Sequence, residues 1–183
     1  MITPKQEAIS TETKSGTGGR FYLFLNHRQA SRLGHVGWGF TLGDGRTCMF
    51  GSTDHLIRHR WWNLWAWVNY MYVAPGDHTD FWFGYGDESE MYRAMSHSRS
   101  HIWYHECKVV VVEDARPGAA EALALSMERA GWAALSNNCV QQTHDIATAY
   151  GVGDAIPDPR RNSLFLVPRL WFPAVTGEHV MLR

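Results

Sequence analysis

The stretch that decides the fold runs from residue 35 to residue 51 and reads HVGWGFTLGDGRTCMFG. Two short runs of apolar, aromatic and β-branched residues flank Gly43, Asp44 and Gly45, and glycines allow the positive φ angles of tight turns. The pattern predicts a β-hairpin in which Leu42 pairs with Thr47. In that register the numbers of any two opposite residues sum to 89, as 42 and 47 do.

Further strands and helices are expected on both sides of this hairpin. Strands are indicated at residues 21–25, 81–86 and 102–114, and helices at residues 88–98, 117–130 and 138–151. These elements come in blocks without strict alternation, which is typical of α+β proteins. We therefore expect an antiparallel sheet packed against helices. The prolines of the tail are expected to break it into short extended pieces.

The chain of 183 residues is long enough to bury one core and short for two. Residues 1–20 are polar and are expected to form a flexible leader, followed by a single domain over residues 21–183. The leader lacks the apolar core of a secretory signal. We therefore expect a cytoplasmic protein, or one exported by a route that needs no signal peptide.

Composition argues against several classes of function. The formal net charge of −1 offers no general attraction to nucleic acid. Residues 61–73 (WWNLWAWVNYMYV) form the most apolar stretch, which is shorter than a membrane-spanning helix, so we expect no integral membrane protein. Three cysteines without CxxC spacing indicate a reducing compartment and no cysteine-rich zinc site.

Cys139 is the candidate nucleophile. It follows Asn137 and Asn138, which are good helix caps, and therefore falls in the first turn of the predicted helix. Unpaired N–H groups and the helix dipole favour a thiolate there, and the same N–H groups suit an oxyanion hole. The alternative is a cysteine buried in the core, which is the commoner role of this residue type.

A thiol nucleophile also needs a base, and the chain has ten histidines. His144 lies five residues after Cys139, about 140° round the helix, and therefore on another face. His35 opens the first strand of the hairpin and could point from a sheet toward the end of a helix that packs across it. We therefore predict that His35 is the base.

A histidine that opens a strand as H-x-G, a turn like LGDGR, and an Asn-Cys pair at a helix start about a hundred residues later resemble the circularly permuted papain-like hydrolases. The group includes permuted NlpC-type peptidases, desumoylating isopeptidase-like proteins and lecithin:retinol acyltransferase-like proteins. The residues that carry the resemblance are His35, Gly37, Leu42, Gly43, Asp44, Asn138 and Cys139. The resemblance implies a permuted papain-like core in a single catalytic domain, with Cys139 and His35 as the catalytic pair.

A third residue orients the histidine in such sites. The register that sums to 89 places Asp54 opposite His35, and a slip would substitute Ser52, Thr53 or His55. The expected oxyanion donors are the backbone N–H of Cys139 and the side chain of Asn138, although Asn138 could equally be only a cap. Trp38, Trp61 and Trp65 are candidates for a substrate-binding wall, with a place in the aromatic core as the alternative.

Other constellations are weaker. His55 and His59 share a helical spacing, as do His97, His101 and His105, but the glutamate of an HExxH motif is missing, so we expect no metal site. Nucleotide-binding glycine motifs and a GxSxG elbow are also missing, and no cofactor is expected.

The sequence thus predicts a cysteine-dependent hydrolase of an amide or peptide bond, with a peptide, peptidoglycan or isopeptide substrate, and a bacterial effector as one setting. Two alternatives stay open. One is a thiol acyltransferase or lipid thioesterase that acts on an acyl substrate. The other is a non-catalytic domain that binds a glycan or a protein. The sequence leaves the oligomeric state undetermined.

Overall fold

The structure of the chain is a computed structural model, and it describes residues 18–53, 72–76, 81–97 and 103–182. A six-stranded antiparallel sheet in the order β5-β3-β2-β1-β6-β8 forms the centre. The strands are β1 (Gly19–Asn26), β2 (His35–Thr41), β3 (Cys48–Ser52), β5 (Trp82–Gly86), β6 (Glu106–Val112) and β8 (Glu178–Met181). The predicted α+β class with an antiparallel sheet is confirmed.

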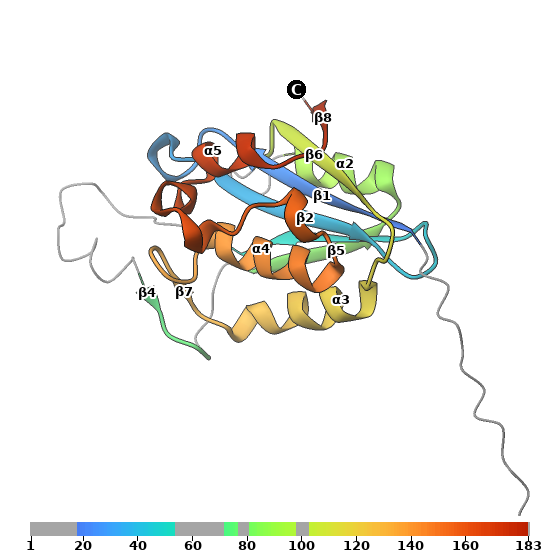
Figure 1. Cartoon of the computed structure of the whole chain (residues 1–183), viewed down its shortest axis with the longest axis horizontal. Helices are drawn as coiled ribbons and strands as arrows, with labels where there is room; N and C mark the ends of the chain where they lie inside the picture. Colours follow the sequence, from blue (N-terminus) through green and yellow to red (C-terminus); the bar gives the residue numbers. More distant parts are fainter. Residues whose placement is uncertain (1–17, 54–71, 77–80, 98–102, 183) are drawn as a thin grey trace, which may run out of the picture.

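Helices cover both faces of this sheet. Helices α3 (Pro117–Ser126) and α4 (Cys139–Tyr150) lie together on one side, and α2 (Glu88–Ser96) lies on the other (Figure 1). Strands β4 (Tyr72–Val73) and β7 (Trp132–Ala133) form a separate two-stranded sheet. Among the described residues, no helix is long and apolar enough to cross a membrane.

The hairpin formed by β2 and β3 has the predicted register. Trp38 pairs with Gly51 and Thr41 pairs with Cys48, so opposite numbers sum to 89. The N–H of Leu42 donates to the carbonyl of Thr47 at 2.7 Å, and the Asp44 carboxylate accepts from the N–H groups of Arg46 and Thr47. The hydrogen bonds of the turn are thus consistent with the alignment of the two strands.

Strand alternation divides the interior into two cores. In β2, Val36, Trp38 and Phe40 face α3 and α4, and they pack with Leu23 of β1. Gly37 and Gly39 face α2, where their missing side chains leave room for Met91, Met95 and Tyr104. Both faces of the central strands are therefore buried.

The tail differs from the expectation. The prolines were expected to produce extended pieces, but Pro159, Pro168 and Pro173 stand in the first turns of short helices. These helices are η4 (Pro159–Arg161), α5 (Pro168–Trp171) and η6 (Phe172–Ala174), with η3 (Gly153–Ala155) and η5 (Ser163–Leu166) beside them. The fixed φ of proline suits the first helical position, which the prediction of extended pieces overlooked.

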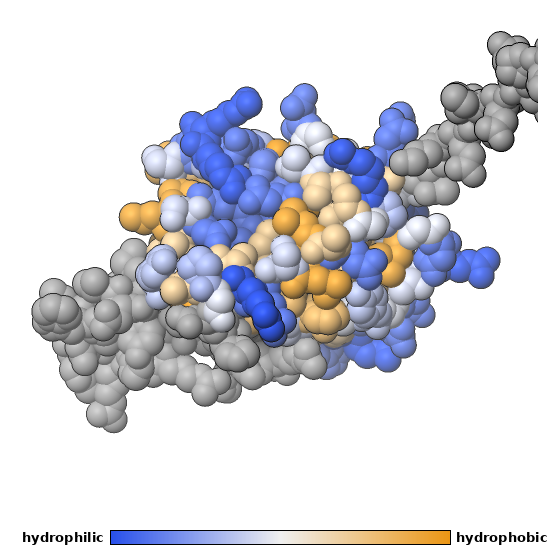
Figure 2. Space-filling view, turned by 90° about the horizontal axis from the view of Figure 1, so that it is seen from below, coloured by the Kyte–Doolittle hydropathy of each residue, from blue (hydrophilic) through white to orange (hydrophobic). Residues whose placement is uncertain are grey.

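The surface carries scattered hydrophobic side chains. Phe83 and Tyr85 on the edge strand β5 are 41% and 46% exposed, and Leu125 on α3 is 42% exposed. Seen from the side of α3, hydrophobic residues are interspersed with hydrophilic ones (Figure 2). Single exposed apolar residues of this kind are normal for a folded domain.

Candidate active site

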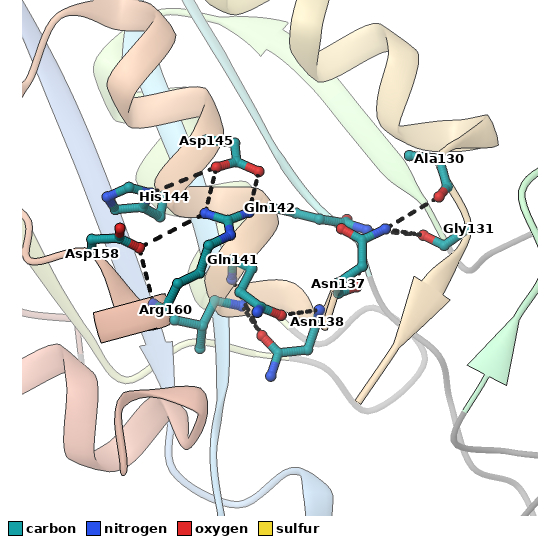
Figure 3. Close-up of polar contacts among 11 residues, drawn as sticks. Ala130, Gly131, Asn137, Asn138, Gln141, Gln142, His144, Asp145, Asp158 and Arg160 are labelled. Atoms are coloured by element: carbon teal, nitrogen blue, oxygen red, sulfur yellow. Dashed lines mark hydrogen bonds and ion pairs between the residues drawn. The ribbon is translucent and has the colours of Figure 1, made fainter. Parts of the chain in front are cut away.

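Cys139 stands at the first position of α4, as predicted. The side chain of Asn138 accepts hydrogen bonds from the N–H groups of Val140 and Gln141, and the side chain of Gln141 accepts from the N–H of Asn138 (Figure 3). This is a capping box, which satisfies N–H groups that the first turn cannot pair internally. The N–H of Cys139 belongs to the same turn and points along the helix dipole.

Asn138 also ties the start of α4 to its surroundings. Its side-chain amide donates to the carbonyls of Ala134 at 2.9 Å and Leu166 at 3.0 Å. An amide group has two N–H bonds, and both are used here. The geometry thus supports a capping role for the Asn138 side chain rather than a role as an oxyanion donor. The backbone N–H of Cys139 remains a candidate oxyanion donor.

The preceding loop is held by two further amides, those of Asn137, which the sequence offered only as a helix cap, and of Gln142, which it did not single out. Asn137 donates to the carbonyls of Ala130 and Gly131, and Gln142 donates to the carbonyls of Gly131 and Asn137 (Figure 3). Gln142 is 1% exposed. The run NNCVQQ is therefore mainly a device that fixes the position of the helix start.

Helix α4 runs parallel to β2, so its first residue lies near the start of that strand. The hydroxyl of Tyr150, the last residue of α4, lies 2.7 Å from the Thr41 hydroxyl, at the end of β2. At the other end, Asn138 bonds Leu166, while the N–H of Arg169 donates to Leu33, just before β2. The first residues of α4 and β2 therefore lie at the same end of the sheet.

His35 is a buried histidine on this strand. It is 3% exposed, and its Nε2 lies 3.3 Å from the Oγ of Ser52 on β3. Its ring lies 6.0 Å from that of Tyr104, whose hydroxyl reaches the space left by Gly37. The imidazole therefore lies on the α2 side of β2. Ser52, which the sequence offered only in case of a register slip, contacts His35 in the unslipped register because diagonal residues share a face.

Cys139 approaches β2 from the opposite side. Its side chain is 7% exposed and packs in the core that contains Val36 and Trp38. His35 alternates with Val36 along the strand and points to the other face. The structure thus brings the two elements together, but it places the thiol and the imidazole on different faces of β2.

The residue pattern of β2 indicates on which face of the strand His35 lies. In HVGWGFT the bulky residues Val36, Trp38 and Phe40 alternate with two glycines, and His35 is in step with the glycines. A long helix packs against the bulky face, because that face offers the larger apolar area. His35 therefore belongs to the face away from α4.

The remaining predicted residues fall into two groups. Trp38 is 1% exposed and stacks on Phe40, so it lies in the core rather than on a substrate wall. Asp54, His55, His59, Trp61, Trp65 and His101 lie outside the described residues. Within the described ranges, no cluster of three or more His, Cys, Asp or Glu residues is arranged to hold a metal ion.

The two other cysteines are distinct from Cys139. Cys48 and Cys107 are fully buried in the core on the α2 side. Burial raises the pKa of Cys48 to about 11 and that of Cys107 well above its ordinary value. Both thiols are therefore protonated and unreactive at neutral pH, so any fast thiol chemistry would belong to Cys139.

Comparisons of the chain with protein-family models, with curated proteins and with solved structures find no match. The resemblance to permuted papain-like hydrolases therefore stays a prediction from a few residues.

Proposed function

We propose that the chain is a cysteine-dependent hydrolase of amide or peptide bonds, with Cys139 as the nucleophile and His35 as its base. The observation that carries the proposal is the position of Cys139 at the capped start of α4, over the strand that His35 opens. Ser52 supports it as the group that orients the imidazole through Nε2. Peptidoglycan and isopeptide linkages are the substrates suggested by the resemblance.

The chemistry would proceed in two steps. His35 takes the proton of the Cys139 thiol, and the sulfur attacks the carbonyl carbon while the N–H of Cys139 stabilises the oxyanion. The C–N bond breaks, the amine leaves with the proton from His35, and an acyl-enzyme remains. Water then attacks the thioester, His35 accepts its proton, and the carboxylic acid and the thiol are released.

The proposal sets one requirement on the geometry. Because the imidazole and the thiol lie on different faces of β2, His35 must reach Cys139 round the first residue of the strand. Gly34, which precedes it, has a φ of +93°, a conformation that suits glycine and gives the chain a turn at this point. The proposal therefore requires a rearrangement of the strand start, where His35 pairs with Asn26 of β1.

The test is the rate of iodoacetamide labelling at each cysteine at pH 7, resolved by peptide mass. We expect Cys139 to react at least about tenfold faster than free cysteine, and His35→Gln, which keeps a polar side chain beside Ser52, to remove the excess. Cys48 and Cys107 serve as internal controls of folding, because they react only when the core opens. Labelling of Cys139 at the rate of free cysteine or slower in both proteins would overturn the proposal.

A second candidate is a non-catalytic domain that binds a glycan or a protein. It is favoured by the 7% exposure of Cys139 and by its separation from His35 across β2. It predicts that Cys139→Ser is retained on immobilised peptidoglycan as well as the unaltered chain, with no cleavage by either. Release of soluble fragments by the unaltered chain alone would exclude this candidate and support the hydrolase.

A further inference from the structure

A cavity of about 330 Å³ opens at the end of β2 that is remote from His35. Its walls include Thr41 of β2, Cys48 of β3 and Tyr22 of β1, and the side chains of Arg20, Arg46 and Glu88 also line it. The volume lies at the lower end of the range of small-molecule sites. Three glycines, Gly18, Gly19 and Gly45, and the exposed Val111 complete the lining.

One guanidinium group beside this cavity is not neutralised by a neighbouring carboxylate. Arg20 Nη1 donates to Glu88 Oε2 at 3.1 Å, so these two groups balance each other. The Asp44 carboxylate, near the turn, is occupied by Thr47 and by the backbone of Arg46. In the described part of the chain, no carboxylate forms an ion pair with the Arg46 side chain.

The inner wall is polar but uncharged. Tyr22 is 0% exposed, and its hydroxyl lies beside the Arg20 and Glu88 side chains without a well-formed hydrogen bond to either. Burial raises the pKa of Tyr22, so the hydroxyl keeps its proton and can act as a donor. The Cys48 thiol, whose pKa burial raises to about 11, is also neutral. The carboxylates of Glu88, Asp44 and Asp87 also act on this thiol, and each is held by Arg20 or by hydrogen bonds at the turn and at the start of α2.

We propose that this cavity binds a small molecule that carries a carboxylate or phosphate group. Arg46 and Arg20 hold the anion, because the planar guanidinium presents paired N–H donors that match two oxygens of either group. The Nη1 of Arg20 stays on Glu88 while its other N–H groups reach the anion, and the Tyr22 hydroxyl donates to the ligand from the inner wall. The site lies at the opposite end of β2 from Cys139, so it is independent of the proposed hydrolase.

Binding is measured by isothermal titration of the full chain with inorganic phosphate and, separately, with citrate, at constant ionic strength. The two probes distinguish a phosphate site from a carboxylate site. Arg46→Gln is expected to weaken the binding of the preferred probe at least about tenfold. The matched control is Arg129→Gln, which removes the same charge at an exposed position in the short helix that follows α3.

A second pair of variants guards against a folding artefact. Val111 is 74% exposed and lines the cavity, so its replacement leaves the core intact. Val111→Glu places a negative charge at the cavity and is expected to weaken binding about as much as Arg46→Gln, while Val111→Gln has little effect. The proposal is overturned if neither probe binds, or if Arg46→Gln and Arg129→Gln weaken binding equally, since the latter result indicates only non-specific attraction to a positive surface.

Discussion

At the residue scale, the polar side chains around α4 act chiefly as supports for the backbone. Asn137, Asn138, Gln141 and Gln142 all bond to backbone groups, and three of these residues are at least 95% buried. A buried amide without partners is costly, so this set specifies one position of the helix start. The backbone at Cys139 is therefore held in one position by these hydrogen bonds.

The role of Asn138 can be separated into its two parts. Asn138→Ala removes the cap and both side-chain donors, and is expected to destabilise the fold by about 2–4 kcal/mol. Asn138→Asp keeps an oxygen that accepts from Val140 and Gln141 but removes the donors to Ala134 and Leu166. It should lose only part of that stability. Urea unfolding of the three proteins measures the difference, and equal losses in both variants would show that the cap contributes nothing.

At the element scale, the tail is fastened to α4 by an ion pair. Arg160 of η4 donates to both carboxylate oxygens of Asp145 on α4, at 2.8 and 2.7 Å (Figure 3). Burial alone would raise the pKa of Asp145, but hydrogen bonds from His144 and Arg160 outweigh it, and the pKa lies below its ordinary value of 3.8. The pair thus stabilises the fold only while Asp145 is ionised.

This link predicts a pH-dependent effect of Arg160→Gln. A carboxyl group with a lowered pKa contributes stability above its unfolded pKa and loses it as pH falls through the folded pKa. At pH 7 the variant should be less stable by about 0.5–1 kcal/mol, a modest value because the side chains of Asp145 and Arg160 are 36% and 43% exposed. The difference should shrink below pH 3.8.

Denaturant unfolding of both proteins at pH 7 and at pH 3 measures this difference. Asp145→Asn is the control, because adding Arg160→Gln to it should cost little at either pH. A difference between the parent and Arg160→Gln that is the same at both pH values would mean that the arginine acts through packing rather than through the carboxylate.

At this scale, the sequence predicted the features that depend on residues close together in the chain, and it missed those that depend on distant residues. The register of β2 and β3 follows from residues 42–47, and the ends of α4 follow from Asn138 and from Gly151, whose φ is +104°. Each depends on residues close together in the chain. The face on which His35 meets its neighbours depends on which helix covers which side. That choice is set by the whole sheet, and Tyr104, which lies beside His35, is distant in sequence.

At the scale of the whole molecule, the central sheet is a partition between two cores. Leu23 and Phe24 are adjacent on β1 and both fully buried, Leu23 in the core on the α3 and α4 side and Phe24 in the core on the α2 side. The described elements share these central strands, so neither core can open without loosening the strand that the other packs against. We therefore expect the described part of the chain to unfold as one unit.

Truncation of each side chain tests this cooperativity. Leu23→Ala is expected to cost about 2–5 kcal/mol and Phe24→Ala about 3–5 kcal/mol, because each leaves a cavity in a fully packed core. In both variants, tryptophan fluorescence and far-ultraviolet circular dichroism should report one transition with the same denaturant midpoint. Val111→Ala, at a 74% exposed position on β6, should shift the midpoint little. If Phe24→Ala instead separates the two signals into distinct transitions, the cores fold independently, and the sheet does not couple them.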